Sequence, residues 1–88
     1  MQLFYRVAAE AARLFARAGG YDPFVLEVHH RGKRDAPSGT ARRLADLCLE
    51  ASPQLTEARP VPAEGPLPPH VLPVTSVRAG GEPGTHVV

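Results

Sequence analysis

The sequence EVHHRGKRDAPSGTA, at residues 27–41, joins a predicted strand to a predicted helix and so decides the fold of the chain. β-branched and aromatic side chains over residues 24–30 favour a half-buried strand that ends at two adjacent histidines. A polar segment broken by Gly32 follows, and Ser-Gly-Thr then opens a stretch whose apolar residues recur at helical spacing. We therefore expect the end of a strand to lie near the start of a helix.

Two helices are predicted, one on each side of this strand in the sequence. The helix over residues 38–51 can begin at Ser38, a favourable N-cap, or at Asp35, because Pro37 is tolerated in a first helical turn. The helix over residues 3–18 ends at two glycines, which accept the left-handed conformation. Its apolar stripe comprises Leu3, Val7, Ala11, Leu14 and Ala18, flanked by Phe4, Ala8 and Phe15. This stripe needs another apolar surface to lie against.

The C-terminal half of the chain is rich in proline and glycine. Seven of the ten prolines lie in residues 53–73, and because proline removes a backbone donor we expect an extended surface loop there. The alternative is a proline-rich ligand for another domain. A strand over residues 74–77, a glycine-rich turn over residues 78–84 and a strand over residues 85–88 are predicted next. The predicted fold class is α+β, with a small mixed β-sheet and two main helices packed on one of its faces.

Composition limits the class of protein. The 88 residues predict one small domain, and the single cysteine, Cys48, excludes an internal disulfide and fits a reducing compartment. A formal net charge of +1 is too small for the electrostatic footprint of a nucleic-acid-binding protein. The sequence shows neither a run of roughly 18 apolar residues nor a signal-peptide pattern. We expect a cytoplasmic domain that binds neither nucleic acid nor membrane and that folds better with a partner domain or subunit.

The predicted helix start has the properties of an anion site. Unpaired backbone amides and the helix dipole favour negative charge there, and Gly39 lets a ligand approach the backbone closely. Thr40 adds a hydroxyl donor, and His29, His30 and Lys33 supply donors and titratable protons nearby. A small carboxylate that needs a proton fits this set. Phosphate also fits the helix start, although the spacing is not that of a P-loop.

These residues also have plainer explanations. Adjacent strand residues point to opposite faces, so one histidine would be packed in the core and the other solvated; both reach one ligand only if the strand has ended by His30. Lys33 is the only lysine beside nine arginines, and lysine can donate a proton whereas arginine stays protonated. A single exposed lysine can nevertheless be retained by chance. No metal site is predicted, because adjacent strand positions diverge and no third ligand is near.

Residues 27–41 closely resemble the signature of dihydrodipicolinate reductases, in which a His-His pair, a lysine three residues later and Asp-Ala-Pro-Ser-Gly-Thr-Ala follow one another. Residues 76–87, SVRAGGEPGTHV, resemble the later SVR-G…G-H-V segment of that family. The helix over residues 3–14 is similar to the family helix that precedes the signature strand. The resemblance covers nearly all of the chain, and residues 53–73 are its unconstrained part.

The resemblance implies a reductase that transfers a hydride from NADPH or NADH to a cyclic, unsaturated dicarboxylate on the route to diaminopimelate and lysine. By match to the signature, His29 is the expected proton donor and acceptor, and Lys33 the expected proton donor. His30, Gly39 and Thr40 are the expected substrate-binding residues. Relatives use this domain to build a tetramer through sheet edges, so a homo-oligomer is also expected.

The chain departs from the complete family pattern. It contains no G-x-G-x-x-G run, so we interpret residues 1–88 as a partial substrate-binding and oligomerisation domain, with the nucleotide-binding domain absent and no cofactor-binding residue. Gly32 stands where many relatives carry a bulkier or polar residue, which would loosen that loop. The match gives Arg78 no catalytic role. Alone, the chain is expected to lack hydride transfer, because nothing would position the nicotinamide against the substrate.

Two competing functions are compatible with the sequence. One is a non-catalytic oligomerisation or small-anion-binding module, which would bind a dicarboxylate or self-associate without turnover. The other is a nucleic-acid patch, whose affinity would fall steeply with salt. Its basic residues would be Arg31, Lys33, Arg34, Arg42 and Arg43. The near-neutral net charge and the missing aromatic platform argue against the patch.

Overall fold

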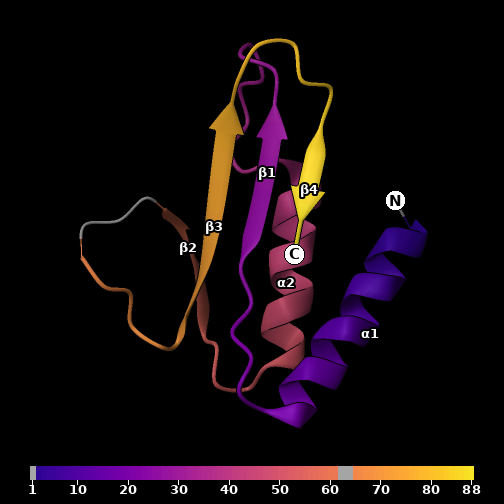
Figure 1. Cartoon of the computed structure of the whole chain (residues 1–88), viewed down its shortest axis with the longest axis vertical. Coiled ribbons are helices and arrows are strands. Elements are labelled where there is room, and N and C mark those ends of the chain that lie inside the picture. The colour runs from indigo at the N-terminus through magenta and orange to yellow at the C-terminus, as the bar shows by residue number, and fades with distance from the viewer. Residues whose placement is uncertain (1, 62–64) are drawn as a thin grey trace.

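The computed structural model describes residues 2–61 and 65–88, and within these ranges the chain forms two helices and four strands (Figure 1). In chain order the elements are α1 (Gln2–Ala18), β1 (Val25–His29), α2 (Gly39–Ala51), β2 (Glu57–Val61), β3 (Val71–Arg78) and β4 (Thr85–Val87). The strands form one mixed sheet in the order β2-β3-β1-β4, with β3 parallel to both β2 and β1, and β4 antiparallel to β1. The predicted α+β class is confirmed.

The helices lie on one side of the sheet. α2 packs against β1, β2 and β3, while α1 packs mainly against α2 and lies beyond the β4 edge (Figure 1). The core includes the buried residues Val25, Ala41, Leu44, Ala45, Cys48, Leu55, Leu72 and Val74. Burial of a large aliphatic side chain stabilises a fold by about 1.5–3 kcal/mol, so this layer between α2 and the sheet carries most of the stability.

Strand β1 alternates between the two faces of the sheet. Val25, Glu27 and His29 are buried and face α2, whereas Leu26 and Val28 are partly buried on the opposite face. The parallel register with β3 aligns Glu27 with Ser76 and His29 with Arg78. The strand ends at His29, so His30 already belongs to the following loop. A charged and a titratable side chain are thereby placed on the core face of a central strand.

Helix α2 begins where the sequence predicts. Ser38 is the N-cap, and its Oγ accepts a hydrogen bond from the Ala41 amide at 3.1 Å, as expected for a serine in this position. The alternative start at Asp35 is therefore wrong. Every third or fourth residue of the helix faces the sheet, which buries Ala41, Leu44, Ala45, Leu47 and Cys48.

Helix α1 ends before two glycines with positive φ, as predicted, but its buried side does not coincide with the predicted apolar stripe. Ala8 is the buried residue of the helix, and Phe4, Tyr5, Ala9 and Ala12 pack against the core beside it. Leu3, Val7 and Leu14 are 76%, 66% and 51% exposed. The predicted stripe is therefore wrong as the buried face, because the contact with α2 is centred on Ala8 and, of the stripe residues, only Ala11 is partly buried.

The expectation of a loop through residues 53–73, of which residues 62–64 lie outside the described residues, is wrong in two places. β2 lies inside this segment, and β3 begins at Val71 rather than at residue 74. Pro60 is accommodated because β2 is an edge strand, where a missing amide need not break a ladder. Pro73 is accommodated because it precedes the first β3 residue that pairs with β1, Val74. The turn predicted over residues 78–84 and the final strand are present, as the loop before β4 and β4 itself.

Neither helix in the described part of the chain combines the length and the apolar character required to cross a bilayer.

Candidate functional site

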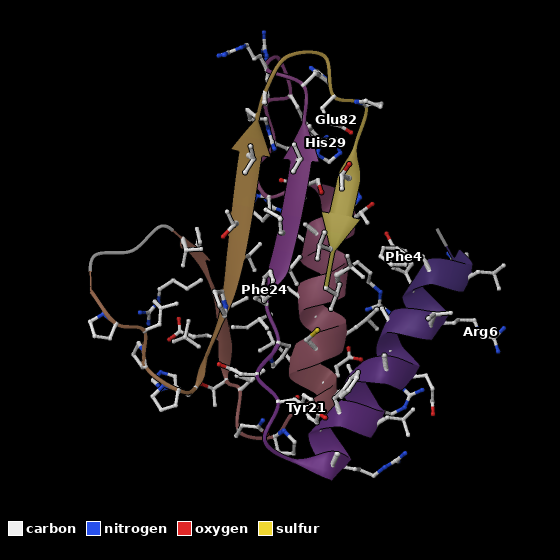
Figure 2. The ribbon with its side chains drawn as sticks, viewed as in Figure 1. Phe4, Arg6, Tyr21, Phe24, His29 and Glu82 are labelled. Carbon is white, nitrogen blue, oxygen red and sulfur yellow. The ribbon has the colours of Figure 1, made fainter. Side chains whose placement is uncertain are left out.

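The residues of the signature gather at the carboxyl ends of the parallel strands. There the loop after β1, the N-terminus of α2 and the loop between β3 and β4 meet. The Arg31 amide donates to the carbonyl of Gly80, and the Ala79 amide donates to the carbonyl of His29, at 3.1 and 3.0 Å. Figure 2 shows His29 at the end of β1 beside β4, near the loop that carries Glu82. Segments far apart in sequence therefore form one end of the molecule.

Glu27 is the centre of this end, although it is fully buried. Its Oε1 lies 2.5 Å from His29 Nδ1, and its Oε2 accepts a hydrogen bond from the Ser38 amide at 3.0 Å. Arg78 donates to both carboxylate oxygens, at 2.8 Å to Oε1 and 3.0 Å to Oε2. A buried carboxylate needs such partners, since an uncompensated charge in the interior is strongly destabilising.

These partners determine the ionisation of Glu27. Burial by itself would raise the pKa of this carboxyl group. Hydrogen bonds, first from Arg78 and then from His29 and neighbouring groups on β3 and at the α2 start, outweigh that effect and lower the pKa of Glu27 from 4.5 to about 2. The same contact with Glu27 raises the pKa of Arg78. Both side chains are therefore charged at neutral pH.

Arg78 also ties the loop after β1 to the sheet. Its Nη2 donates to the carbonyl of Asp35 at 2.7 Å, and its Nε donates to the carbonyl of Lys33 at 3.3 Å. The guanidinium group thereby connects β3 to the backbone between β1 and α2. From the sequence Arg78 was expected to order the site or an interface without a catalytic role, and its planar fork is suited to this set of acceptors.

His29 is only 9% exposed and is enclosed by residues from three elements. Its ring makes an edge-to-face contact with His86 of β4, with ring centres 5.1 Å apart. A Cβ built on Gly84 would lie 3.1 Å from His29 Nε2, so a larger residue at position 84 would press on this nitrogen. Burial, and then the proximity of His29, lower the pKa of His86. Its neutral Nε2 lies 3.2 Å from Ser38 Oγ.

The start of α2 is open to solvent beside this cluster. A Cβ built on Gly39 would meet nothing within 4 Å. Thr40 Oγ1 accepts a hydrogen bond from the Tyr5 hydroxyl at 3.4 Å, so its own proton remains able to serve another acceptor. Because Ser38 is held by Glu27 and His86, the first amides of the helix have a fixed direction.

The predicted site residues differ in how they are linked to the start of α2. His29 is joined to the helix start through Glu27, which contacts both His29 and Ser38. His30 is exposed, and its Nδ1 accepts a hydrogen bond from the Gly32 amide at 3.1 Å. The Lys33 ammonium group lies 2.9 Å from Asp35 Oδ1, on the outer side of the same loop. The two histidines thus differ, one packed and one solvated, because the strand ends at His29 and His30 lies in the following loop.

Two hollows of the described chain lie along α1 and not at this cluster. One, of about 460 Å³, is apolar and lies between α1, residues 21–24 and Val88. The other lies between α1 and the first half of α2, near Arg43. Within residues 2–61 and 65–88, no three or more His, Cys, Asp or Glu side chains are grouped in a way that could hold a metal ion.

The sequence analysis did not identify Glu27 or His86 as part of this site. It also did not predict the contact between Ser38 and His86. The signal for Glu27 was present: it occupies an inward position of the β1 alternation, between Val25 and His29. A charged residue at such a position requires a buried partner. The identity of that partner, Arg78, depends on a strand pairing 51 positions later and could not be read locally.

The sequence and the fold of the chain were compared with those of known proteins, and both comparisons find dihydrodipicolinate reductases. The 4-hydroxy-tetrahydrodipicolinate reductase of Myxococcus xanthus (strain DK1622) is 41% identical over 91 residues, covering 100% of this chain and 33% of that protein. The enzyme of the same name from Aquifex aeolicus (strain VF5) is 32% identical over 88 residues, with the same coverage. A solved structure, the dipicolinate-bound dihydrodipicolinate reductase from Paenisporosarcina sp. TG-14, superposes with a TM-score of 0.68 at 31% identity. It covers 96% of this chain and 32% of that one.

The chain therefore spans about one third of the length of these relatives. The family described as "Dihydrodipicolinate reductase, C-terminus" matches residues 1–88. Because this match includes every residue, and the fold agrees with a solved member, the chain belongs to the family of C-terminal domains of dihydrodipicolinate reductases.

Proposed function

We propose that the chain is the substrate-binding half of an NAD(P)H-dependent reductase that acts on a cyclic dicarboxylate of the dihydrodipicolinate type, in lysine and diaminopimelate biosynthesis. The observation that carries the proposal is the open N-terminus of α2, where a ligand has room to reach the backbone at Gly39. Helix N-termini attract anions through their free amides and their dipole. The solved relative that contains dipicolinate, a ring with two carboxylates, supports this ligand class.

Binding would use the groups at that opening. The amides of Gly39 and Thr40, with the Thr40 hydroxyl, would donate to one carboxylate of the substrate, since the helix itself leaves these amides without partners. His30 is exposed on the adjoining loop and would contact the substrate as well. The fixed position of Ser38 keeps these donors aimed in one direction, which lowers the entropy cost of binding.

Protonation would use His29 and Lys33. Hydride addition to the ring leaves negative charge that a proton must neutralise, and a lysine ammonium or an imidazole can supply it. Lys33 is paired with Asp35, whose side chain is 57% exposed. The Lys33 side chain is 24% exposed, but the Asp35 end of the pair faces solvent, so the substrate can compete with Asp35 for the ammonium group.

The described residues do not fit the nicotinamide cofactor. A dinucleotide site needs a glycine-rich turn between a strand and a helix, so that the backbone approaches the pyrophosphate. Here the turn between β1 and α2 carries Asp-Ala-Pro-Ser before its helix, and Arg78 already occupies its carbonyls. The hydride donor would have to be held by residues outside this domain.

Titration with dipicolinate, followed by amide NMR, tests the proposal. We expect the amide signals of Gly39 and Thr40 to shift on saturation, and Thr40→Val to weaken binding about tenfold, as expected for losing one hydrogen bond to a charged group. Thr56→Val is the matched control, because Thr56 is exposed at the opposite end of the sheet, beside the start of β2. Unchanged affinity in Thr40→Val, or shifts confined to other residues, would refute the assignment.

A non-catalytic oligomerisation module is the second candidate, favoured by the uncovered face of the sheet. Val77 and Val87 are 38% and 39% exposed there, beside the partly buried Leu26 and Val28. The edges β2 and β4 have free strand sides, through which copies of the chain could pair as well. Light scattering after size exclusion separates the candidates: a stable oligomer that binds no dicarboxylate supports the module.

A further inference from the structure

The roles assigned above leave the buried carboxylate of Glu27 unused. Glu27 is fully buried, yet it contacts His29, Ser38 and Arg78 at once. A residue needed only for packing at this position of β1 would be apolar, because burying a charged pair seldom stabilises a fold more than aliphatic side chains do. The carboxylate therefore calls for an explanation beyond stability.

We propose that Glu27 is a positioning residue for the substrate site: it holds the proton of neutral His29 on Nδ1 and fixes the start of α2 relative to that ring. The role of Glu27 in a reaction rests on the proposed function. The geometry that supports it does not, because each contact of Glu27 is made with another residue of the chain.

The tautomer follows from the chemistry of the two groups. An ionised carboxylate has no proton to donate, so the 2.5 Å contact with Oε1 requires the hydrogen on Nδ1 of His29. The second ring nitrogen, Nε2, is then the one that can accept or release a proton. It points toward Gly84, where the absence of a side chain leaves the space that a Cβ would fill at 3.1 Å. A carboxylate behind an imidazole commonly fixes both its tautomer and its orientation.

Arg78 keeps this arrangement in the required charge state. Its bidentate contact compensates the carboxylate, so Glu27 remains an acceptor. The same guanidinium holds the carbonyls of Lys33 and Asp35. The Glu27–Arg78 ion pair therefore fixes three parts of the site relative to one another. These are the His29 ring, the backbone beside Lys33 and the first amides of α2.

The adjacent histidine provides an internal control. His30 Nδ1 accepts from the Gly32 amide, so neutral His30 must carry its proton on Nε2. Two neighbouring histidines are thus expected to be opposite tautomers. Long-range proton–nitrogen NMR of the unaltered chain, at a pH where both rings are neutral, distinguishes them through the nitrogen shifts.

We expect the Nδ1–H form for His29 and the Nε2–H form for His30. In Glu27→Gln the amide can donate as well as accept, so the ratio of His29 tautomers should move at least tenfold toward Nε2–H, while His30 stays unchanged. If the unaltered chain shows Nε2–H at His29, or if Glu27→Gln leaves the ratio as it was, the inference is overturned. Should Glu27→Gln not fold, Glu27→Asp retains the charge and must keep Nδ1–H; loss of that form overturns the inference equally.

The failure of the proposed function is visible separately. Dipicolinate that does not bind the unaltered chain would remove the substrate assignment, while the tautomer measurement would still decide whether Glu27 controls His29. Conversely, bound dipicolinate with the wrong tautomer would keep the substrate site and remove Glu27 from it. A purely structural ion pair would lower thermal stability in Glu27→Gln without shifting the His29 tautomers.

Discussion

Glu27 and Arg78 illustrate how a single residue position carries both structure and chemistry. The β1 alternation places a carboxylate in the core, and only a donor from β3 makes that position tolerable. His29 follows the same alternation and is buried, whereas His30 lies past the strand end and is exposed. Strand periodicity accounts for His29 and the end of the strand for His30, but the partner of the carboxylate behind His29 required the register of β1 with β3.

Acid should destabilise the fold through Glu27. Its folded-state pKa is about 2 against 4.5 in the unfolded chain, so the stabilisation is complete above pH 4.5 and is lost as pH falls toward 2. The shift corresponds to roughly 3 kcal/mol. Urea unfolding followed by circular dichroism at several pH values measures this, and Glu27→Gln should show a flatter dependence below pH 4.5. Equal slopes in both proteins would contradict the account.

Lys33 is expected to be required for turnover. When a nucleotide-binding domain of a relative is supplied, Lys33→Ala should lower kcat by about 10²–10⁴-fold, as for loss of a general acid. Arg34→Ala is the control, because Arg34 is the adjacent basic residue and its side chain is exposed, whereas Lys33 is partly buried. Steady-state assays of reduced nicotinamide consumption give the answer. Turnover that persists in Lys33→Ala would remove Lys33 from the role of proton donor.

Among the elements, the helices and β1 could be predicted, because each has a local periodicity and a local stop signal. β2 could not be predicted, since Glu-Ala-Arg-Pro-Val shows no alternation of buried residues and contains a proline. It forms because β3 offers a parallel edge, which is a tertiary cause. The buried side of α1 was also misjudged, since only contact with α2 decides which part of a broad apolar arc is covered.

The start of α2 should depend on Ser38. Ser38→Ala removes the acceptor of the Ala41 amide and the partner of His86, and we expect a loss of about 1–2 kcal/mol in the free energy of unfolding. Ser38→Thr retains the hydroxyl and should restore most of this stability. Denaturant midpoints for the two variants provide the measurement. A Ser38→Ala variant as stable as the parent would show that the cap is dispensable.

Across the chain as a whole, apolar surface remains uncovered beside α1. Val7 and Phe15, which are 66% and 50% exposed, line the 460 Å³ hollow, and exposed patches of this kind promote association. We expect the isolated chain to self-associate with rising concentration and Val7→Lys with Phe15→Gln to reduce this, with a loss of about 0.5–1.5 kcal/mol in stability because Phe15→Gln removes the ring contact with Tyr21. Sedimentation velocity measures the effect. Arg17→Gln, on the polar side of the same helix, should leave association unchanged.

The substrate assignment itself depended on a different kind of information from the fold. Signature residues at 27–41 identified the family, and the match over residues 1–88 confirms it. The roles of His29, His30, Lys33, Gly39 and Thr40 stay predictions, because a role in catalysis is a property of a complex with substrate. What the structure adds is the shared location of these groups at one end of the sheet.

The position of β1 between β3 and β4 has a consequence for biosynthesis. Both of its neighbours are encoded after it, the first beginning at Val71, so the strand has no sheet partner until residues 71–87 begin to be synthesised. At about 5–20 residues per second, ribosomes need several seconds to make the intervening segment. During that interval Val25 and Leu26 are open to wrong partners, and nascent chains stalled before residue 71 should recruit chaperones more strongly than those stalled after residue 87.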